Sequence, residues 1–128
     1  MSLKYDAMQH PDPQQWLADS EAERIEAVET YHRNHRLKVR KLLLHATFHV
    51  VVENQVALGD DTPVQQTLVR LMEEGLDRHD AVHAIGSVLA SQVYDLLKTP
   101  EQQTDPNAAY YSELRQLTAG SWRASGSK

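Results

Sequence analysis

The segment from Lys38 to Leu58 constrains the fold more than any other part of the chain, because it is apolar around most of a helical circumference. A helix of this kind needs other elements on several sides to shield it from water, so we expect it at the centre of the molecule. Gly59, followed by two aspartates, ends it with a residue suited to a left-handed cap. The segment therefore predicts a fold built around one central helix.

Four further segments begin with residues typical of a helix N-terminus, either a capping Ser, Thr or Asp or a proline in the first turn. They predict helices over 20–35, 62–75, 77–98 and 106–117. In the first two, Ser20 with Glu23 and Thr62 with Gln65 match the capping box. Because short connections favour antiparallel neighbours, we expect an all-α fold: a compact helical bundle of four main helices plus a short C-terminal helix.

The two ends of the chain lack comparable signals. Residues 1–18 contain the stretch HPDP, whose prolines disfavour helix in the residues before them, and we expect an irregular lead-in there. Residues 119–128 are small and polar, and we expect a flexible tail. A length of 128 residues suits one hydrophobic core, so a single bundle domain is expected over 19–118.

Charge and composition argue against several classes of function. The net charge is −5, and the one basic cluster, RNHRLKVRK at 33–41, is typical of a helix end and a solvated linker, so no nucleic-acid partner is expected. No apolar run approaches the ~18 residues that span a bilayer, so no membrane contact is expected. The absence of cysteine excludes thiolate metal sites and, with no secretory signal visible, favours a cytoplasmic protein.

Two pairs of histidines are embedded in the predicted helices. In HATFHVVVE, His45 and His49 are four residues apart, and in HDAVH the same spacing separates His79 and His83. On a helix, each pair lies on one face, one turn apart. The first pair falls in the middle of the apolar stripe of 38–58. The second flanks the apolar face of 77–98, in line with Gly86, where another helix can approach closely.

A fifth histidine, His32, continues the apolar stripe of the helix predicted over 20–35, and Glu29 precedes it in an E-x-x-H pair. Glu53 lies at the edge of the stripe that carries the first histidine pair. Five of the seven histidines thus project from three helices toward a common interior, whereas His10 and His35 are expected to be exposed.

Metal binding is the first hypothesis that this pattern supports. Neutral imidazole is a common ligand for zinc, iron and nickel, and i, i+4 pairs on facing helices are a standard way to build a site in a bundle core. A divalent metal is the expected cofactor, and no organic cofactor is indicated. The expected ligands, with the last three as further or supporting groups, are His45, His49, His79, His83, His32, Glu53 and Glu29. This set would suffice for a dinuclear centre, whereas a mononuclear site needs fewer residues; a catalytic site would use Glu53 as general base.

A structural alternative explains the same residues without a metal. Buried imidazoles need hydrogen-bond partners, and Glu29, Glu53 and Asp80 are available to supply them. The protein would then be a non-enzymatic interaction module, with exposed parts of 62–75 and 106–117 facing a partner or, in a homodimer, a second copy. Neither G-x-S-x-G nor H-E-x-x-H occurs, so no reaction or small-molecule substrate is assigned.

The histidine motifs also resemble those of a known family. The stretches WLADSEAERIEAVETYH, HATFHVVVENQVA and GLDRHDAVHAIGSVLA resemble the bacterial domain-of-unknown-function family DUF1841. Its pattern combines H-x3-H-x3-E-x-Q with a later H-[DE]-A-x-H-A-I. The matching residues here are His45, His49, Glu53 and Gln55, then His79, Asp80, Ala81, His83, Ala84 and Ile85. The resemblance covers about residues 40–97 and implies a small helical bacterial protein with no assigned reaction.

Overall fold

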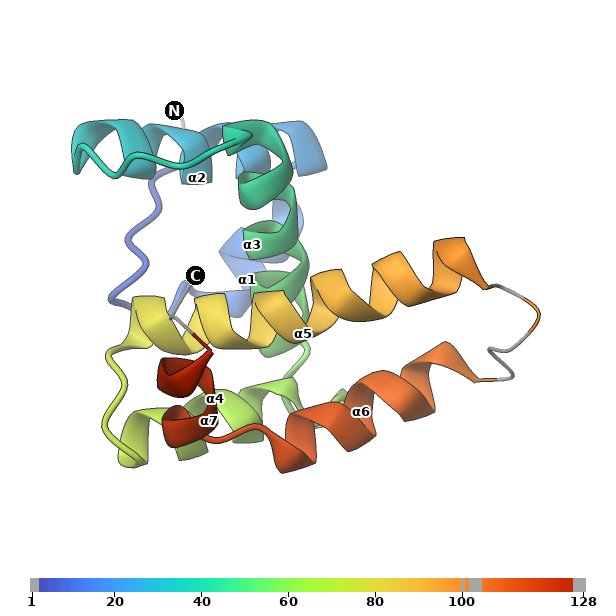
Figure 1. Cartoon of the computed structure of the whole chain (residues 1–128). Helices are drawn as coiled ribbons and strands as arrows, with labels where there is room; N and C mark the ends of the chain where they lie inside the picture. The colour runs from blue at the N-terminus through green and yellow to red at the C-terminus, as the bar shows by residue number, and fades with distance from the viewer. Residues whose placement is uncertain (1–2, 100, 102–104, 126–128) are drawn as a thin grey trace.

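The computed structural model describes residues 3–99, 101 and 105–125, and the regular structure in this part of the chain is entirely helical (Figure 1). The elements are α1 (Pro13–Ala18), α2 (Glu21–Asn34), α3 (Leu42–Ala57), a 3₁₀ turn η1 (Gly59–Asp61), α4 (Val64–Glu73), α5 (Arg78–Lys98), α6 (Pro106–Gln116) and α7 (Ala119–Ala124). The all-α prediction is confirmed. The number of main helices is five rather than four, because α6 has 11 residues and packs against both α4 and α5.

The apolar helix α3 lies at the centre, in contact with α1, α2, α4 and α5. In Figure 1, α2 lies across one end of α3, and α5 crosses α3 farther along. The start of α3 differs from the prediction, because Lys41 adopts a left-handed conformation with φ of 57° and the helix begins at Leu42 rather than Lys38. Among the described residues, no helix is both long and apolar enough to cross a bilayer.

Helix capping explains most of the observed boundaries. The side chains of Ser20, Asp77 and Asp105 each accept a hydrogen bond from the backbone N–H three residues later, which fixes the starts of α2, α5 and α6 where they were predicted. The capping box predicted for Thr62 and Gln65 is wrong, because the Thr62 hydroxyl accepts from the N–H two residues later, at 3.3 Å. Consequently α4 begins at Val64.

The described residues near both ends of the chain form short helices that contribute to the core, whereas the sequence predicted an irregular lead-in and a flexible tail. The lead-in contains helix α1, whose Trp16 is buried and donates its ring N–H to the Asn54 side chain at 2.8 Å. The expectation of a flexible tail is wrong for residues 119–124, because they form α7 and bury Trp122. Residues 126–128 of that predicted tail lie outside the described residues. Burial of a large indole stabilises short helices that would not form in isolation.

Two apolar clusters meet along α3. One joins α3 to α4, α5, α6 and α7 around Leu68, Ile85 and Leu114. The other joins α3 to α2 and the N-terminal segment around Trp16 and Val28. Polar side chains lie between these two clusters, where α3 packs against both α2 and α5.

Candidate metal centre

Five histidines from three helices converge in the interior. One ring nitrogen from each lies within 4.8 Å of those from all the others, and the set comprises His32 from α2, His45 and His49 from α3, and His79 and His83 from α5. Helical spacing places each α3 and α5 pair on one face, and the packing of α3 against α5 and α2 brings the faces together. The structure thus unites the five histidines that the sequence assigned to a common interior.

The closest approaches within the cluster are between Nε2 atoms. The Nε2 of His45 lies 2.9 Å from that of His83 and 3.1 Å from that of His32, and the Nε2 atoms of His49 and His79 are 3.2 Å apart. Two neighbouring nitrogens on one metal, with bonds of about 2.0–2.1 Å, lie about 2.9–3.4 Å apart. The spacing of the imidazoles therefore matches the edges of a metal coordination shell.

The partners of the outward-facing nitrogens fix the tautomers of two histidines. The Nδ1 of His32 lies 2.8 Å from the carbonyl oxygen of Val28, which can only accept, so Nδ1 carries the proton. The Tyr5 hydroxyl donates to Glu53 at 2.5 Å and therefore accepts from Nδ1–H of His49 at 3.0 Å. A neutral imidazole has one N–H, so both residues direct an Nε2 lone pair into the cluster. Metal-binding histidines are held in the same way.

All five imidazoles are neutral at pH 7. Burial, followed by the influence of neighbouring histidines, lowers the pKa of His45 and His79 to about 4 and that of His83 to about 3. Burial likewise lowers the pKa of His32 and, more strongly, that of His49. Neutral imidazoles keep the lone pairs that metal coordination requires.

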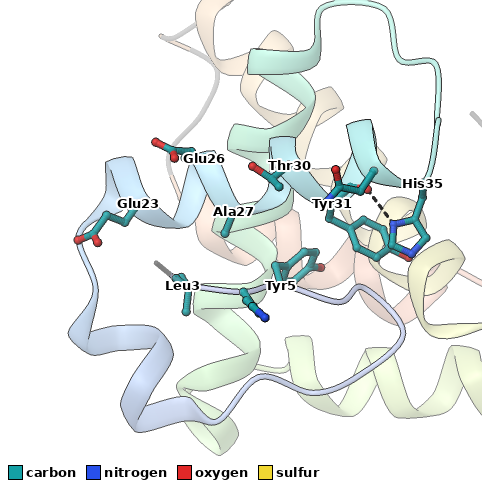
Figure 2. A pocket seen from close by; sticks show the side chains of 10 residues that line it. Leu3, Tyr5, Glu23, Glu26, Ala27, Thr30, Tyr31 and His35 are labelled. Carbon is teal, nitrogen blue, oxygen red and sulfur yellow. Dashed lines mark hydrogen bonds between the residues drawn. The ribbon is translucent and has the colours of Figure 1, made fainter. Parts of the chain in front are cut away.

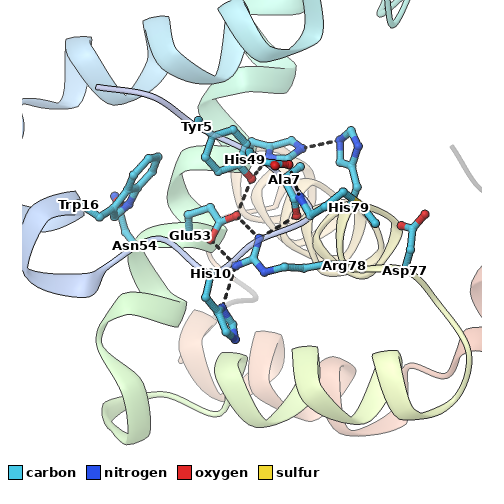
Figure 3. Close-up of polar contacts among 12 residues, drawn as sticks. Tyr5, Ala7, His10, Trp16, His49, Glu53, Asn54, Asp77, Arg78 and His79 are labelled. Atoms are coloured by element: carbon cyan, nitrogen blue, oxygen red, sulfur yellow. Dashed lines mark hydrogen bonds and ion pairs between the residues drawn. The ribbon is translucent and has the colours of Figure 1, made fainter. Parts of the chain in front are cut away.

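A buried charged network lies directly behind His49 (Figure 3). Arg78 donates two hydrogen bonds to the carboxylate of Glu53, at 2.7 and 2.8 Å, and the Tyr5 hydroxyl donates a third. Arg78 also donates to the carbonyl oxygen of Ala7 at 3.0 Å. Burial and the charge of Glu53 raise the pKa of Tyr5, which keeps its hydroxyl protonated. Glu53 is therefore a support for His49, and its engaged carboxylate is unsuited to the role of general base.

The remaining carboxylates and histidines singled out in the sequence lie outside the cluster. Glu29 pairs with Arg33 on the same helix at 4.0 Å. Asp80 lies in the first turn of α5, where its backbone N–H donates a hydrogen bond to the side chain of the cap residue Asp77. Among the described residues, no cluster histidine has a direct hydrogen bond to a carboxylate. His10 and His35 are exposed, as predicted.

Tyr5 and Arg78 were not identified from the sequence, although both hold the site together. The signal for Arg78 was present: Glu53 stands on an otherwise apolar helix, and a buried carboxylate needs a cation. Arg78 directly precedes His79, so the register that brings the histidines together also brings Arg78 to Glu53. For Tyr5, which lies 44 residues from His49, the sequence contains no periodic pattern that would indicate the contact.

One cavity opens onto the histidine cluster. It has a volume of about 260 Å³ and is lined by His45, His49 and His83 together with side chains of α3 and α5. A separate hollow of about 520 Å³ lies between the N-terminal segment and α2, where Tyr5, Glu23 and Tyr31 line it (Figure 2). None of the five cluster histidines lines this second hollow. The smaller cavity therefore gives a route from solvent to the cluster.

Comparison with known proteins places the chain in a family. A family model described as "Domain of unknown function (DUF1841)" matches residues 5–116, a range that includes the five histidines as well as Tyr5, Glu53 and Arg78. The match is wider than the 40–97 on which the sequence resemblance rested. No curated protein and no solved structure matches the chain. The chain belongs to the DUF1841 family.

Proposed function

We propose that this protein binds one divalent transition-metal ion in the histidine cluster. The observation that carries the proposal is the convergence of five neutral imidazoles, with one nitrogen of each within 4.8 Å of all the others. Two of them, His32 and His49, are oriented by hydrogen bonds at Nδ1 so that Nε2 lone pairs face inward. A site with ligands and supporting groups both in place is preorganised for a metal.

The hydrogen-bonding alternative leaves one of the two short contacts of His45 without a matched donor and acceptor. The Nε2 of His45 lies within 3.1 Å of the Nε2 atoms of both His32 and His83, and His32 presents a lone pair. If His45 Nε2 carries a proton, it donates to His32 and has no lone pair to accept from His83. If it carries a lone pair, it faces the lone pair of His32. A cation at the centre removes this conflict, because every inward lone pair becomes a ligand.

The donor set favours particular metals and a single ion. Imidazole nitrogen suits zinc, iron and nickel, whereas magnesium and calcium prefer oxygen ligands. A site with two metals holds them about 3.5–4 Å apart, and in the helical-bundle examples carboxylates supply several of the ligands. Here Glu53 is engaged by Arg78, and Glu29 pairs with Arg33 outside the cluster. The five histidines are therefore proposed as the ligands of a mononuclear centre, with Tyr5 and Glu53 orienting His49.

Metal content tests the proposal. Protein purified without a polyhistidine tag, then incubated with zinc, iron(II) or nickel and freed of excess ion, should retain about one metal per chain. Since metal bound only by the folded state stabilises it, a chelator should lower the melting temperature by about 10 °C when the ion was present at ~100 times its dissociation constant.

Two substitutions separate the cluster from other histidines. His49→Ala removes an inward nitrogen and should abolish both metal retention and the chelator effect. His35→Ala is the matched control, because His35 is exposed and lies outside the cluster. If the wild-type protein retains none of the three metals and melts at the same temperature with and without chelator, metal binding is refuted and the structural alternative takes its place.

A further inference from the structure

We propose that the cavity beside the histidine cluster binds a small organic carboxylate with an apolar body, whose carboxylate group completes the coordination of the metal. This inference rests on the proposed metal site and adds the chemical class of its external ligand. It is based on the side chains that line the cavity, on the space that Gly86 leaves there, and on the balance of charge around it.

The cavity is lined by three imidazoles and by mostly apolar groups. Its volume is about 260 Å³, and His45, His49 and His83 line it. Phe48, Val82 and Ala90 supply apolar surface, and Ser87 adds one hydroxyl. Pockets of this kind, largely apolar with a few polar groups at one end, take ligands with one polar head and an apolar remainder.

Gly86 lines the cavity and leaves space in it. It lies in the middle of α5, where glycine costs about 1 kcal/mol relative to alanine. Its backbone is not in the left-handed region, and a Cβ added there would meet no heavy atom within 4 Å. Neither backbone conformation nor close helix packing therefore requires glycine here. The effect of its missing side chain is to leave space in the cavity that it lines.

Charge around the site favours an anion. Five neutral imidazoles would leave a divalent ion with its full charge, and the neighbouring carboxylate of Glu53 is already paired with Arg78. A second, more open hollow of about 470 Å³ shares His45, Phe48 and Ala90 with the cavity and is bounded by Arg40 and Lys41. The net charge of the protein is −5, and these two exposed cations beside the cavity create a local positive potential that attracts anions.

The test uses cobalt(II), whose visible absorption reports changes in its ligands. The wild-type protein is loaded with cobalt and titrated with benzoate and with acetate. Both share the carboxylate head, but only benzoate carries a ring for the apolar walls. Benzoate should change the spectrum saturably and bind at least ~10-fold more tightly than acetate, because its ring is removed from water.

Gly86 variants show whether the cavity is the binding place. Gly86→Leu puts a side chain into the cavity and should keep the cobalt spectrum while losing the benzoate response. Gly86→Ala, which meets no neighbour, should retain the fold and weaken benzoate more than acetate. Ser91→Leu is the matched control, since it adds the same side chain to an exposed position of α5 outside the cavity. Arg40→Gln should weaken benzoate by about threefold at low ionic strength, and Arg115→Gln on α6 should not.

The outcomes distinguish this inference from the metal proposal. If the wild-type protein binds none of cobalt, zinc, iron and nickel, the metal proposal is refuted, and the carboxylate inference that rests on it is refuted as well. If cobalt binds but benzoate leaves its spectrum unchanged, the inference alone is overturned. It is also overturned if benzoate binds no more tightly than acetate, or if Gly86→Leu responds to benzoate as the wild type does.

Discussion

Two polar regions lie next to each other in the interior of this protein, and they differ in how completely their charges and hydrogen bonds are matched internally. In the first, Glu53 and Arg78 balance each other's charge, and the carboxylate accepts three hydrogen bonds from Arg78 and Tyr5. In the second, the histidine cluster, the three closest pairs of Nε2 atoms are 2.9–3.2 Å apart, and no carboxylate of the described residues is hydrogen-bonded to them. Both regions use side chains of α3 and α5, to which Tyr5 of the N-terminal segment is added in the first and His32 of α2 in the second.

The difference separates a structural network from a site. A buried network in which charges and hydrogen bonds are matched needs no additional component and serves to fix the packing of the elements that carry it. In the histidine cluster, by contrast, His32 and His49 direct lone pairs inward, and His45 has two close imidazole neighbours but can form only one matched hydrogen bond between Nε2 atoms. The Glu53–Arg78 network thus joins α3 to α5, while the histidine cluster beside it is the region in which we propose that a metal binds.

The largest expected effect is the loss of stability of the metal-free protein in acid, which we attribute to the histidine cluster. Burial lowers the pKa of the cluster histidines, to about 4 for His45 and His79 and about 3 for His83, whereas an imidazole in the unfolded chain has a pKa of about 6.5. Between these values the unfolded state binds more protons. The free energy of unfolding therefore keeps this contribution above about pH 6.5 and loses it as pH falls toward 4.

The slope of that loss can be measured by urea denaturation at a series of pH values. Each histidine protonated only in the unfolded chain adds at most about 1.4 kcal/mol per pH unit, and less where it is partly exposed. Replacing His83 by Leu removes one such group and should make the slope shallower by about one proton. A free energy of unfolding that stays constant between pH 7 and pH 5 would contradict the presence of buried neutral histidines.

Breaking the charged network should have the next largest effect. Arg78→Met leaves Glu53 buried without its cation and should lower the free energy of unfolding by about 3–5 kcal/mol. The double variant Glu53→Leu with Arg78→Met removes both charges and should be less destabilised than the single one. Arg33→Gln, which removes an exposed arginine paired with Glu29, should change stability by no more than about 0.5 kcal/mol. Equal losses for Arg78→Met and Arg33→Gln would show that the buried pair is not a stabilising unit.

Local signals in the sequence were sufficient for most of the fold. Capping residues and apolar periodicity act within a few residues, so the starts of α2, α5 and α6 follow from Ser20, Asp77 and Asp105. The two short helices were missed because each depends on burying one tryptophan, Trp16 or Trp122, against distant parts of the chain. Burial of that kind is a tertiary effect and leaves no pattern over six residues.

In the candidate site too, contacts that follow from helical spacing were predicted, and contacts made by distant segments were not. The i, i+4 spacing of the α3 and α5 pairs indicated which histidines share a face, and the packing of the helices brought the faces together. Glu29 was expected beside His32 because both lie on one helix surface, but it pairs with Arg33 instead. Tyr5 could not be placed, since its contacts with His49 and Glu53 are made by an extended segment far away in sequence.

Among the described residues, the Tyr5 hydroxyl is hydrogen-bonded both to a cluster histidine and to the charged network. Tyr5→Phe tests whether this connection matters for metal binding. The change removes the oxygen that accepts from His49 Nδ1 and donates to Glu53, while the ring stays packed against Trp16 and Tyr31. Loss of such a supporting group lowers metal affinity by about 10- to 100-fold. Zinc affinity, measured by competition with a chromophoric chelator, should fall by that factor while one ion per chain still binds.

Tyr110→Phe is the matched control for this substitution. Tyr110 is also a buried tyrosine, and its hydroxyl donates to the Gln55 side chain at 2.7 Å, away from the histidines. Tyr110→Phe loses one hydrogen bond and should lower the free energy of unfolding of the metal-free protein by about 1 kcal/mol, whereas Tyr5→Phe loses two, one of them to a buried carboxylate, and should lower it by about 2–3 kcal/mol. Only Tyr5→Phe should also weaken zinc, because only Tyr5 holds the tautomer of a ligand. If both variants bind zinc as the wild type does, the orientation of His49 does not depend on Tyr5, and the charged network has no part in the metal site.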